Sequence, residues 1–115
     1  MGACACIGII VLLVPLVPEG VNMREKVIEQ KLVRAAKNMG GIALKFVSPG
    51  FDGMPDRIVL LPSGHMGFVE VKSMGCKPRP LQLARHRLLR GLGFKVYVLD
   101  DEQQIGGILD EIRTT

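Results

Sequence analysis

Two acidic residues and a lysine, Asp56, Glu70 and Lys72, are spaced so that a pair of short strands would bring them together. Strand alternation places Glu70 and Lys72 on one face and Val69 and Val71 on the other. Two neighbouring carboxylates raise each other's pKa unless a cation lies between them. The pattern therefore suits a hard divalent ion such as Mg²⁺, which prefers oxygen ligands.

The same residues have a simpler interpretation. Asp after Pro is common at turns, and Glu-x-Lys on a half-exposed strand often forms only a weak ion pair in solvent. From these residues alone, a metal site and a solvated strand end both stay open.

A β-hairpin would position the three side chains. Residues 57–61 form an apolar run of strand length, residues 62–65 supply the turn, and residues 67–72 resume the strand pattern. A turn centred in the middle of these four residues pairs positions whose numbers sum to about 127. That register places Asp56 opposite Val71.

An amphipathic helix over residues 24–39 is expected before the hairpin and ends at Gly40-Gly41. Its apolar positions at helical spacing are Ile28, Leu32, Ala35 or Ala36, and Met39. Glu25 and Glu29 lie one turn apart beside this stripe, and a carboxylate next to a buried face needs a partner. A helix cap or an exposed ion pair is the alternative role for either acid.

A second helix is expected from Pro80 to about Leu92, because proline favours the first helical position. Its predicted core positions are Leu81, Ala84, Leu88 and Leu92, and its predicted polar face holds Gln82, Arg85 and His86.

The remaining elements are strands over residues 42–47 and 95–99 and a last helix over residues 103–113. The order is helix, strand, strand, strand, helix, strand, helix. The hairpin is antiparallel, whereas the strand–helix–strand crossover implies a parallel pair. The sequence therefore predicts an α/β fold with a mixed β-sheet flanked by helices.

Positive charge is concentrated in the second half of the chain, although the net charge is only +4. No acid occurs between Glu70 and Asp100, and the basic residues there are Lys72, Lys77, Arg79, Arg85, Arg87, Arg90 and Lys95. Such a stretch favours a polyanion such as a phosphate backbone. A solvated helix face is the alternative.

Residues 1–22 differ from the rest, because 7–17 is an unbroken apolar run too short to span a membrane. We expect an extension upstream of a natural start at Met23, or an arm used in self-association. Residues 23–115 are then one domain. Three cysteines make no framework of disulfides, so a cytoplasmic protein is expected.

Taken together, a helix Glu, Gly53-Met-Pro-Asp-Arg57, Phe68-Val-Glu-Val-Lys72 and the following Gln82 resemble the VRR-NUC (virus-type replication-repair nuclease) family. This family belongs to the PD-(D/E)xK superfamily, and the resemblance, to its small stand-alone phage and prophage members, spans roughly residues 23–115. It implies a restriction-endonuclease-like core and a metal-dependent DNA endonuclease.

The resemblance also implies roles for individual residues. Asp56, Glu70 and the backbone carbonyl of Val71 would bind Mg²⁺ or Mn²⁺, Lys72 would act on the attacking water or the phosphate, and Gln82 would support the site. The helix acid would be Glu29, with Glu25 as the alternative. The predicted DNA contacts are Lys45, Lys77, Arg79, Arg85, Arg87 and Arg90.

The expected substrate is branched or double-stranded DNA, including four-way junctions, and the expected assembly is a homodimer in the cytoplasm of a bacterial host. No organic cofactor and no membrane are expected. A module on the same fold that binds DNA junctions without cutting them is the alternative.

Overall fold

Four strands form one mixed sheet, in the order β1-β2-β3-β4, in the computed structural model, which describes residues 23–114. The elements are α2 (Met23–Asn38), β1 (Ile42–Lys45), β2 (Arg57–Leu61), η1 (Pro62–Gly64), β3 (His65–Val71), α3 (Pro80–Gly91), β4 (Val96–Leu99), η2 (Glu102–Gln104) and α4 (Ile105–Arg113). β1, β2 and β3 pair antiparallel, and β3 pairs with β4 in parallel. The predicted order of elements and the mixed sheet are confirmed. The prediction for residues 1–22 lies outside the described residues.

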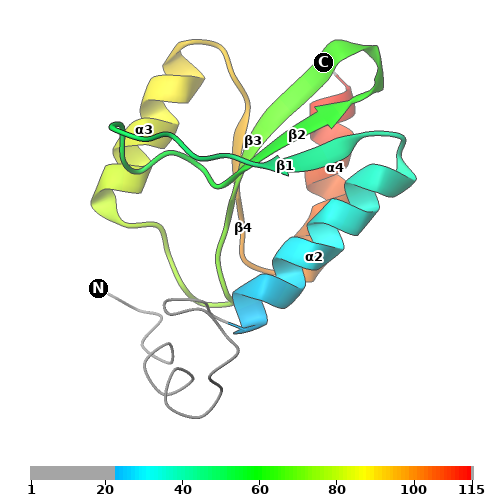
Figure 1. Cartoon of the computed structure of the whole chain (residues 1–115), viewed down its shortest axis with the longest axis horizontal. Helices are drawn as coiled ribbons and strands as arrows, with labels where there is room; N and C mark the ends of the chain where they lie inside the picture. Colours follow the sequence, from blue (N-terminus) through cyan, green and yellow to red (C-terminus); the bar gives the residue numbers. More distant parts are fainter. Residues whose placement is uncertain (1–22, 115) are drawn as a thin grey trace.

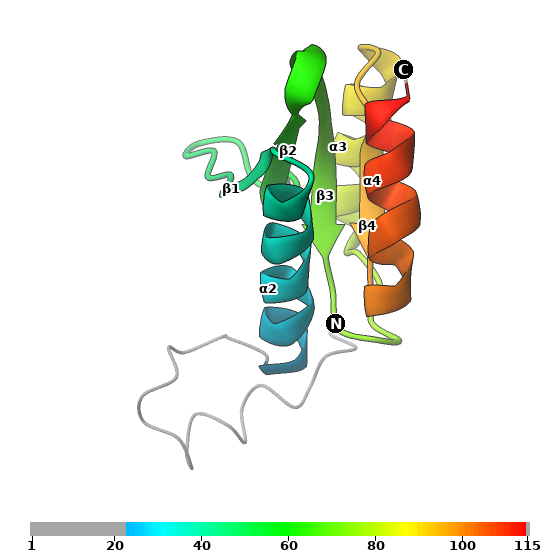
Figure 2. The ribbon, with the colours of Figure 1, turned by 90° about the vertical axis from the view of Figure 1, so that its right-hand side faces the viewer.

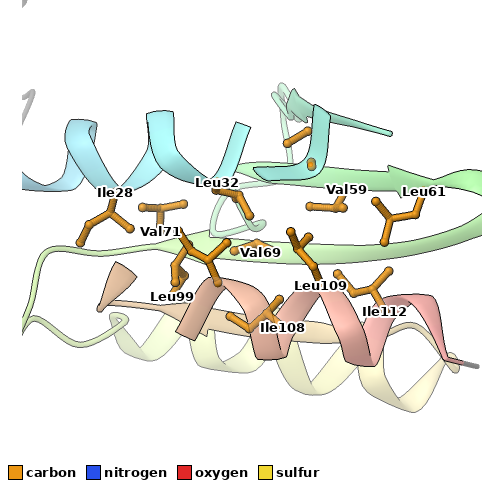
Figure 3. Close-up of a cluster of buried hydrophobic side chains, with 13 residues drawn as sticks. Ile28, Leu32, Val59, Leu61, Val69, Val71, Leu99, Ile108, Leu109 and Ile112 are labelled. Atoms are coloured by element: carbon orange, nitrogen blue, oxygen red, sulfur yellow. The ribbon is translucent and has the colours of Figure 1, made fainter. Parts of the chain in front are cut away.

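The helices lie on both faces of the sheet. Figure 1 shows α2 and α4 on one side of the strands and α3 on the other, and Figure 2 looks onto the side covered by α2 and α4. The main core lies on the α2 and α4 side, where thirteen buried side chains meet (Figure 3). These include Leu32 of α2, Val69 and Val71 of β3, and Ile112 of α4. None of the helices in residues 23–114 is long and apolar enough to cross a membrane.

The hairpin register differs by one residue from the predicted one, because Arg57 pairs with Val69 and Leu61 with His65. The turn has three residues, not four, since Ser63 (φ 71°) and Gly64 (φ 79°) both adopt the left-handed conformation and reverse the chain early. The slip does not separate the acidic residues. Val69 and Val71 still enter the core, and Glu70 points to the opposite face, toward α3.

The buried face of α3 is not the predicted one. Leu81, Leu88 and Leu92 are exposed, at 43%, 44% and 65% of their surface, whereas Gln82, His86 and Leu89 are buried. The helix packs over the end of β3 where Glu70 lies. A buried carboxylate there requires polar neighbours, so the polar residues of α3 face the sheet. Only Leu89 joins an apolar cluster, with Phe68 and Val96.

Candidate active site

Four segments contribute ionisable and polar side chains to one end of the sheet. They are the first turns of α2, the residue before β2, the last residues of β3 with Lys72, and the first two turns of α3. The site lies around the end of β3, and residues from both faces of the sheet contribute to it.

Asp56 is held against the end of β3. The backbone N–H of Val71 donates a hydrogen bond to Asp56 Oδ1 at 3.0 Å. Burial raises the pKa of Asp56 above its usual value, and the Glu29 carboxylate raises it further, while the bond from Val71 works against both. A carboxylate that is oriented but poorly compensated is well suited to bind a cation.

Glu70 is the most perturbed group of the site. It is 3% exposed. Burial, followed by the charge of Asp56, raises its pKa to about 8, against the opposing effect of Lys72. The Lys72 ammonium lies 3.6 Å from Glu70 Oε2 and is itself largely shielded from solvent. Glu70 therefore carries a proton at neutral pH unless a further positive charge arrives.

Gln82 connects Glu70 to the start of α3. Its side-chain amide donates to Glu70 Oε2 at 2.8 Å, and its Oε1 accepts from the backbone N–H of Arg79 at 2.8 Å. The second bond fixes which end of the amide faces the carboxylate, because Oε1 is already occupied. Gln82 thus lies where its predicted supporting role requires.

His86 lies one turn further along α3. Its Nε2 is 3.9 Å from Glu70 Oε1, and its ring is 1% exposed. Burial, with the cations of Arg90 and Lys72, lowers the pKa of His86, which favours a neutral ring. From its sequence position His86 was predicted only to lie on a polar helix face, with no functional role. The spacing of Gln82 and His86, four residues apart on one face, is the signal that could have identified it.

The two helix acids have different surroundings. Glu29 Oε2 accepts from Arg57 Nε at 2.8 Å and lies 3.8 Å from the Lys45 ammonium. Glu29 also raises the pKa of Asp56, whereas Glu25 interacts electrostatically with Asp56, Lys72 and Glu70. Burial and the charge of Asp56 raise the pKa of Glu25, and Lys72 lowers it. Glu25 also raises the pKa of Glu70.

The donor set fits a small hard cation. Two oriented carboxylates, Asp56 and Glu70, meet beside the peptide of Val71, and Glu70 Oε1 is buried with no hydrogen-bond partner among the described residues. Within residues 23–114, no three His, Cys, Asp or Glu side chains come close enough to hold a metal by themselves. One or two carboxylates completed by water and substrate oxygens is the usual Mg²⁺ environment.

The predicted DNA-contacting residues divide into two groups. Lys77, Arg79 and Arg87 are exposed around α3. Arg85 and Arg90 also bind the protein: Arg85 Nε donates to the carbonyl of Asp52 at 2.8 Å, and Arg90 donates to that of Val96 at 2.8 Å.

Arg85 also stacks on an aromatic ring, with its guanidinium carbon 3.8 Å from the ring centre of Phe51. It thereby fastens the loop before Asp56 to α3. Lys45, the remaining predicted contact, lies on β1 beside Glu29, 64% exposed at its side chain.

Comparisons with known proteins show which proteins the chain resembles. No family model matches the chain. It is 50% identical over 90 residues to a protein of Acyrthosiphon pisum secondary endosymbiont phage 1 named "Putative nuclease p44", which covers 78% of this chain and 96% of the relative. A solved structure described as "VRR_NUC domain" superimposes with a TM-score of 0.71 at 32% identity, covering 76% of this chain and 95% of the other.

Proposed function

The chain belongs to the VRR-NUC family, with its restriction-endonuclease-like α/β fold, and on that basis we propose that it is a metal-dependent DNA endonuclease that hydrolyses phosphodiester bonds. The observation that carries the proposal is the meeting of Asp56, Glu70 and Lys72 at one end of the sheet. Glu70 there keeps a buried oxygen without a hydrogen-bond partner among the described residues. A buried carboxylate oxygen without a hydrogen bond lowers the stability of the fold, so a purely structural role does not explain why this one is left unpaired.

Asp56, Glu70 and the carbonyl of Val71 would hold the cation, Mg²⁺ or Mn²⁺. When bound, such an ion lowers the pKa of a coordinated water and neutralises charge on a phosphate oxygen. The protein contributes the orientation of Asp56 through the Val71 N–H, and the orientation of Glu70 through Gln82.

Lys72 acts on the substrate. Its ammonium is largely buried and lies 3.6 Å from Glu70, so its position is fixed before DNA arrives. From there it can donate to the attacking water or to a non-bridging phosphate oxygen as negative charge develops. When Glu70 is ionised, its negative charge attracts the Lys72 ammonium more strongly, so the charge of Glu70 helps to hold Lys72 in place.

We assign the third acid to Glu25, the alternative to Glu29 that the family resemblance left open. The charge of Glu25 acts on Asp56, Lys72 and Glu70. The charge of Glu29 acts on Asp56 alone among these three, and Arg57 and Lys45 compensate it. Glu25 would hold a water in the outer layer of the site, since it forms no cluster of three ligand side chains with the other acids.

The phosphate backbone would lie along the exposed basic side of α3. Lys77, Arg79 and Arg87 are the free-standing contacts on this side, because Arg85 and Arg90 each hold a backbone carbonyl of the protein. Such contacts position the nucleic acid without reading its sequence. This supports selection by DNA structure, with branched DNA and four-way junctions in phage replication, recombination or repair as the proposed substrates, in the cytoplasm of a bacterial host.

A homodimer is part of the proposal, because one chain carries one site and a branched substrate offers two strands. The apolar sheet face at β1 and β2 supports it. Ile42 and Leu60 pair across the strands, and Leu44 lies beside them; they are 47%, 36% and 47% exposed. Light scattering should give twice the mass of the chain, and Leu44→Glu should reduce it to that of the monomer. A monomeric wild type at micromolar concentration would exclude the dimer.

The deciding experiment is cleavage of labelled four-way junction, flap, single-stranded and duplex DNA with Mg²⁺, Mn²⁺ or EDTA. Wild type is compared with Asp56→Asn and with Arg113→Ala, a control whose ion pair with Asp110 is on the surface of α4. Metal-dependent cutting that Asp56→Asn alone abolishes is the expected result.

The same assay separates the alternative function. Tight, salt-dependent binding of junctions without cutting under any metal would identify a junction-binding module. We favour cleavage because Asp56, Glu70 and Lys72 are all present at the end of β3, where Asp56 accepts from the Val71 N–H and Lys72 lies 3.6 Å from Glu70. Neither binding nor cutting would refute both functions.

A further inference from the structure

A buried histidine faces a buried carboxylate oxygen with no hydrogen bond between them. His86 Nε2 lies 3.9 Å from Glu70 Oε1, beyond hydrogen-bond distance. Both ring nitrogens of His86 lack a hydrogen-bond partner among the described residues, and so does Glu70 Oε1. Three unpaired polar atoms on two neighbouring buried side chains are unusual in a protein interior, where most such atoms are paired.

The other oxygen of the same carboxylate is fully engaged. Glu70 Oε2 accepts from Gln82 at 2.8 Å and lies near Lys72. Gln82 and His86 are four residues apart on α3, so their side chains lie on one face of the helix. One helix therefore presents one donor to each oxygen of Glu70, and only the first is in contact.

We propose that His86 is a positioning residue for Glu70, whose Nε2–H closes onto Oε1 when the carboxylate binds a divalent cation. This inference rests on the proposed function. Two donors from one helix then prevent the carboxylate from rotating, and its remaining lone pairs keep a fixed direction. Partners of this kind behind a ligand raise metal affinity, and their loss lowers it about 10–100-fold.

A packing role is the competing explanation, because His86 is fully buried beside Leu89. Substitutions at this position can separate the two. His86→Gln keeps an N–H donor at the place of Nε2, His86→Asn places its amide nearer to Nδ1, and His86→Leu fills the space without a donor. Leu89→Ala, on the next turn of α3, is the control for loosened packing.

The measurement is Mn²⁺ affinity of the full chain without DNA, from the signal of free Mn²⁺ in electron paramagnetic resonance. Circular dichroism confirms that each variant is folded. We expect His86→Leu and His86→Asn to bind Mn²⁺ about 10–100-fold more weakly, and His86→Gln to stay within about threefold of wild type. Folded Leu89→Ala should retain wild-type affinity.

Two results would overturn the inference: wild-type affinity in His86→Leu, or equal losses in His86→Gln and His86→Asn. If His86→Leu does not fold, the difference in Mn²⁺ affinity between His86→Gln and His86→Asn is sufficient to test the inference. These results differ from a failure of the proposed function, in which wild type itself binds no Mn²⁺ and Asp56→Asn changes nothing.

Discussion

Two buried glutamates, one on each side of the sheet, are treated differently by their surroundings. Glu29 on α2 is 8% exposed and accepts a hydrogen bond from Arg57, with Lys45 nearby. Glu70 on β3 is 3% exposed, has Lys72 3.6 Å away, and keeps one oxygen unpaired within the described residues. The two carboxylates are therefore similarly buried, but the charge of Glu29 is compensated more fully than that of Glu70.

The difference separates a structural acid from a working one. A guanidinium with a 2.8 Å bond supplies both charge and hydrogen bonding to Glu29, so nothing further is needed there. Glu70 has an amide and a more distant ammonium, and its pKa rises to about 8. Its missing compensation is what a bound cation would supply.

The largest effect that we predict is on cleavage. Glu70→Gln should lower the cleavage rate by about 10³-fold, because it removes a negative charge from the metal site. Glu29→Gln should lower it by no more than about fivefold, since a mutation outside the site removes no transition-state contact. Single-turnover cleavage of a four-way junction with saturating Mn²⁺ measures both. Equal losses in the two variants would erase the distinction between the glutamates.

The same pair should have opposite effects on stability. Folded Glu70 holds its proton up to about pH 8, whereas the unfolded chain releases it near the ordinary value. The contribution of Glu70 to the unfolding free energy therefore falls as the pH rises from about 4.5 to 8. Glu70→Gln lacks this loss and should be more stable than wild type at pH 8 by about 4 kcal/mol, with little difference at pH 4.5.

Glu29→Gln should instead destabilise the protein by about 1–3 kcal/mol at pH 8, because it leaves Arg57 without its charged partner. Urea unfolding with a chelator present, at both pH values, measures the three proteins. A stabilised Glu29→Gln, or a Glu70→Gln advantage that is the same at both pH values, would contradict the two roles.

The next prediction compares the acids of α2. Glu25→Gln should lower cleavage about 10–100-fold, as expected for a residue that supports a metal site from outside its ligands. Its effect on unfolding should be small, because Glu25 is only partly buried. Cleavage at several Mn²⁺ concentrations is the measurement. If Glu29→Gln proves the more damaging of the two in cleavage, the choice of Glu25 is wrong.

The smallest effect concerns Lys45, the more exposed of the two basic residues that lie beside Glu29. Lys45→Ala should weaken DNA binding only a few-fold and reduce the salt dependence of binding by about one phosphate contact. Its cleavage rate at saturating DNA should match that of wild type. Fluorescence anisotropy over a salt series tests this, and an unchanged salt slope would remove Lys45 from the DNA surface.

Much of the fold follows from local sequence patterns. The alternation that places Val69 and Val71 opposite Glu70 is a property of any strand, and the element order follows from apolar runs and turn residues. The hairpin register was missed by one residue because Ser63 adopts a left-handed conformation that is rare outside glycine. No pattern in this sequence predicts a left-handed conformation at a serine.

The arrangement of α3 could not be predicted from its leucines. Helical periodicity identifies two candidate faces, and the more apolar one is the usual choice. Here the polar face is buried, because Glu70 lies beneath it, and this is known only once the helix is placed over β3. For the same reason His86 was missed. The choice between Glu25 and Glu29 likewise depends on where Arg57 points.

The attachment of α3 has a consequence for behaviour on warming. This helix carries Gln82 and His86, and through Arg85 it also holds the loop that leads to Asp56. Yet its only buried apolar side chain is Leu89, whereas α2 and α4 share the thirteen-residue core with the sheet. Segments with few buried apolar contacts open first. Heat should therefore inactivate the enzyme by releasing α3 at a temperature at which the sheet and the other two helices are still folded.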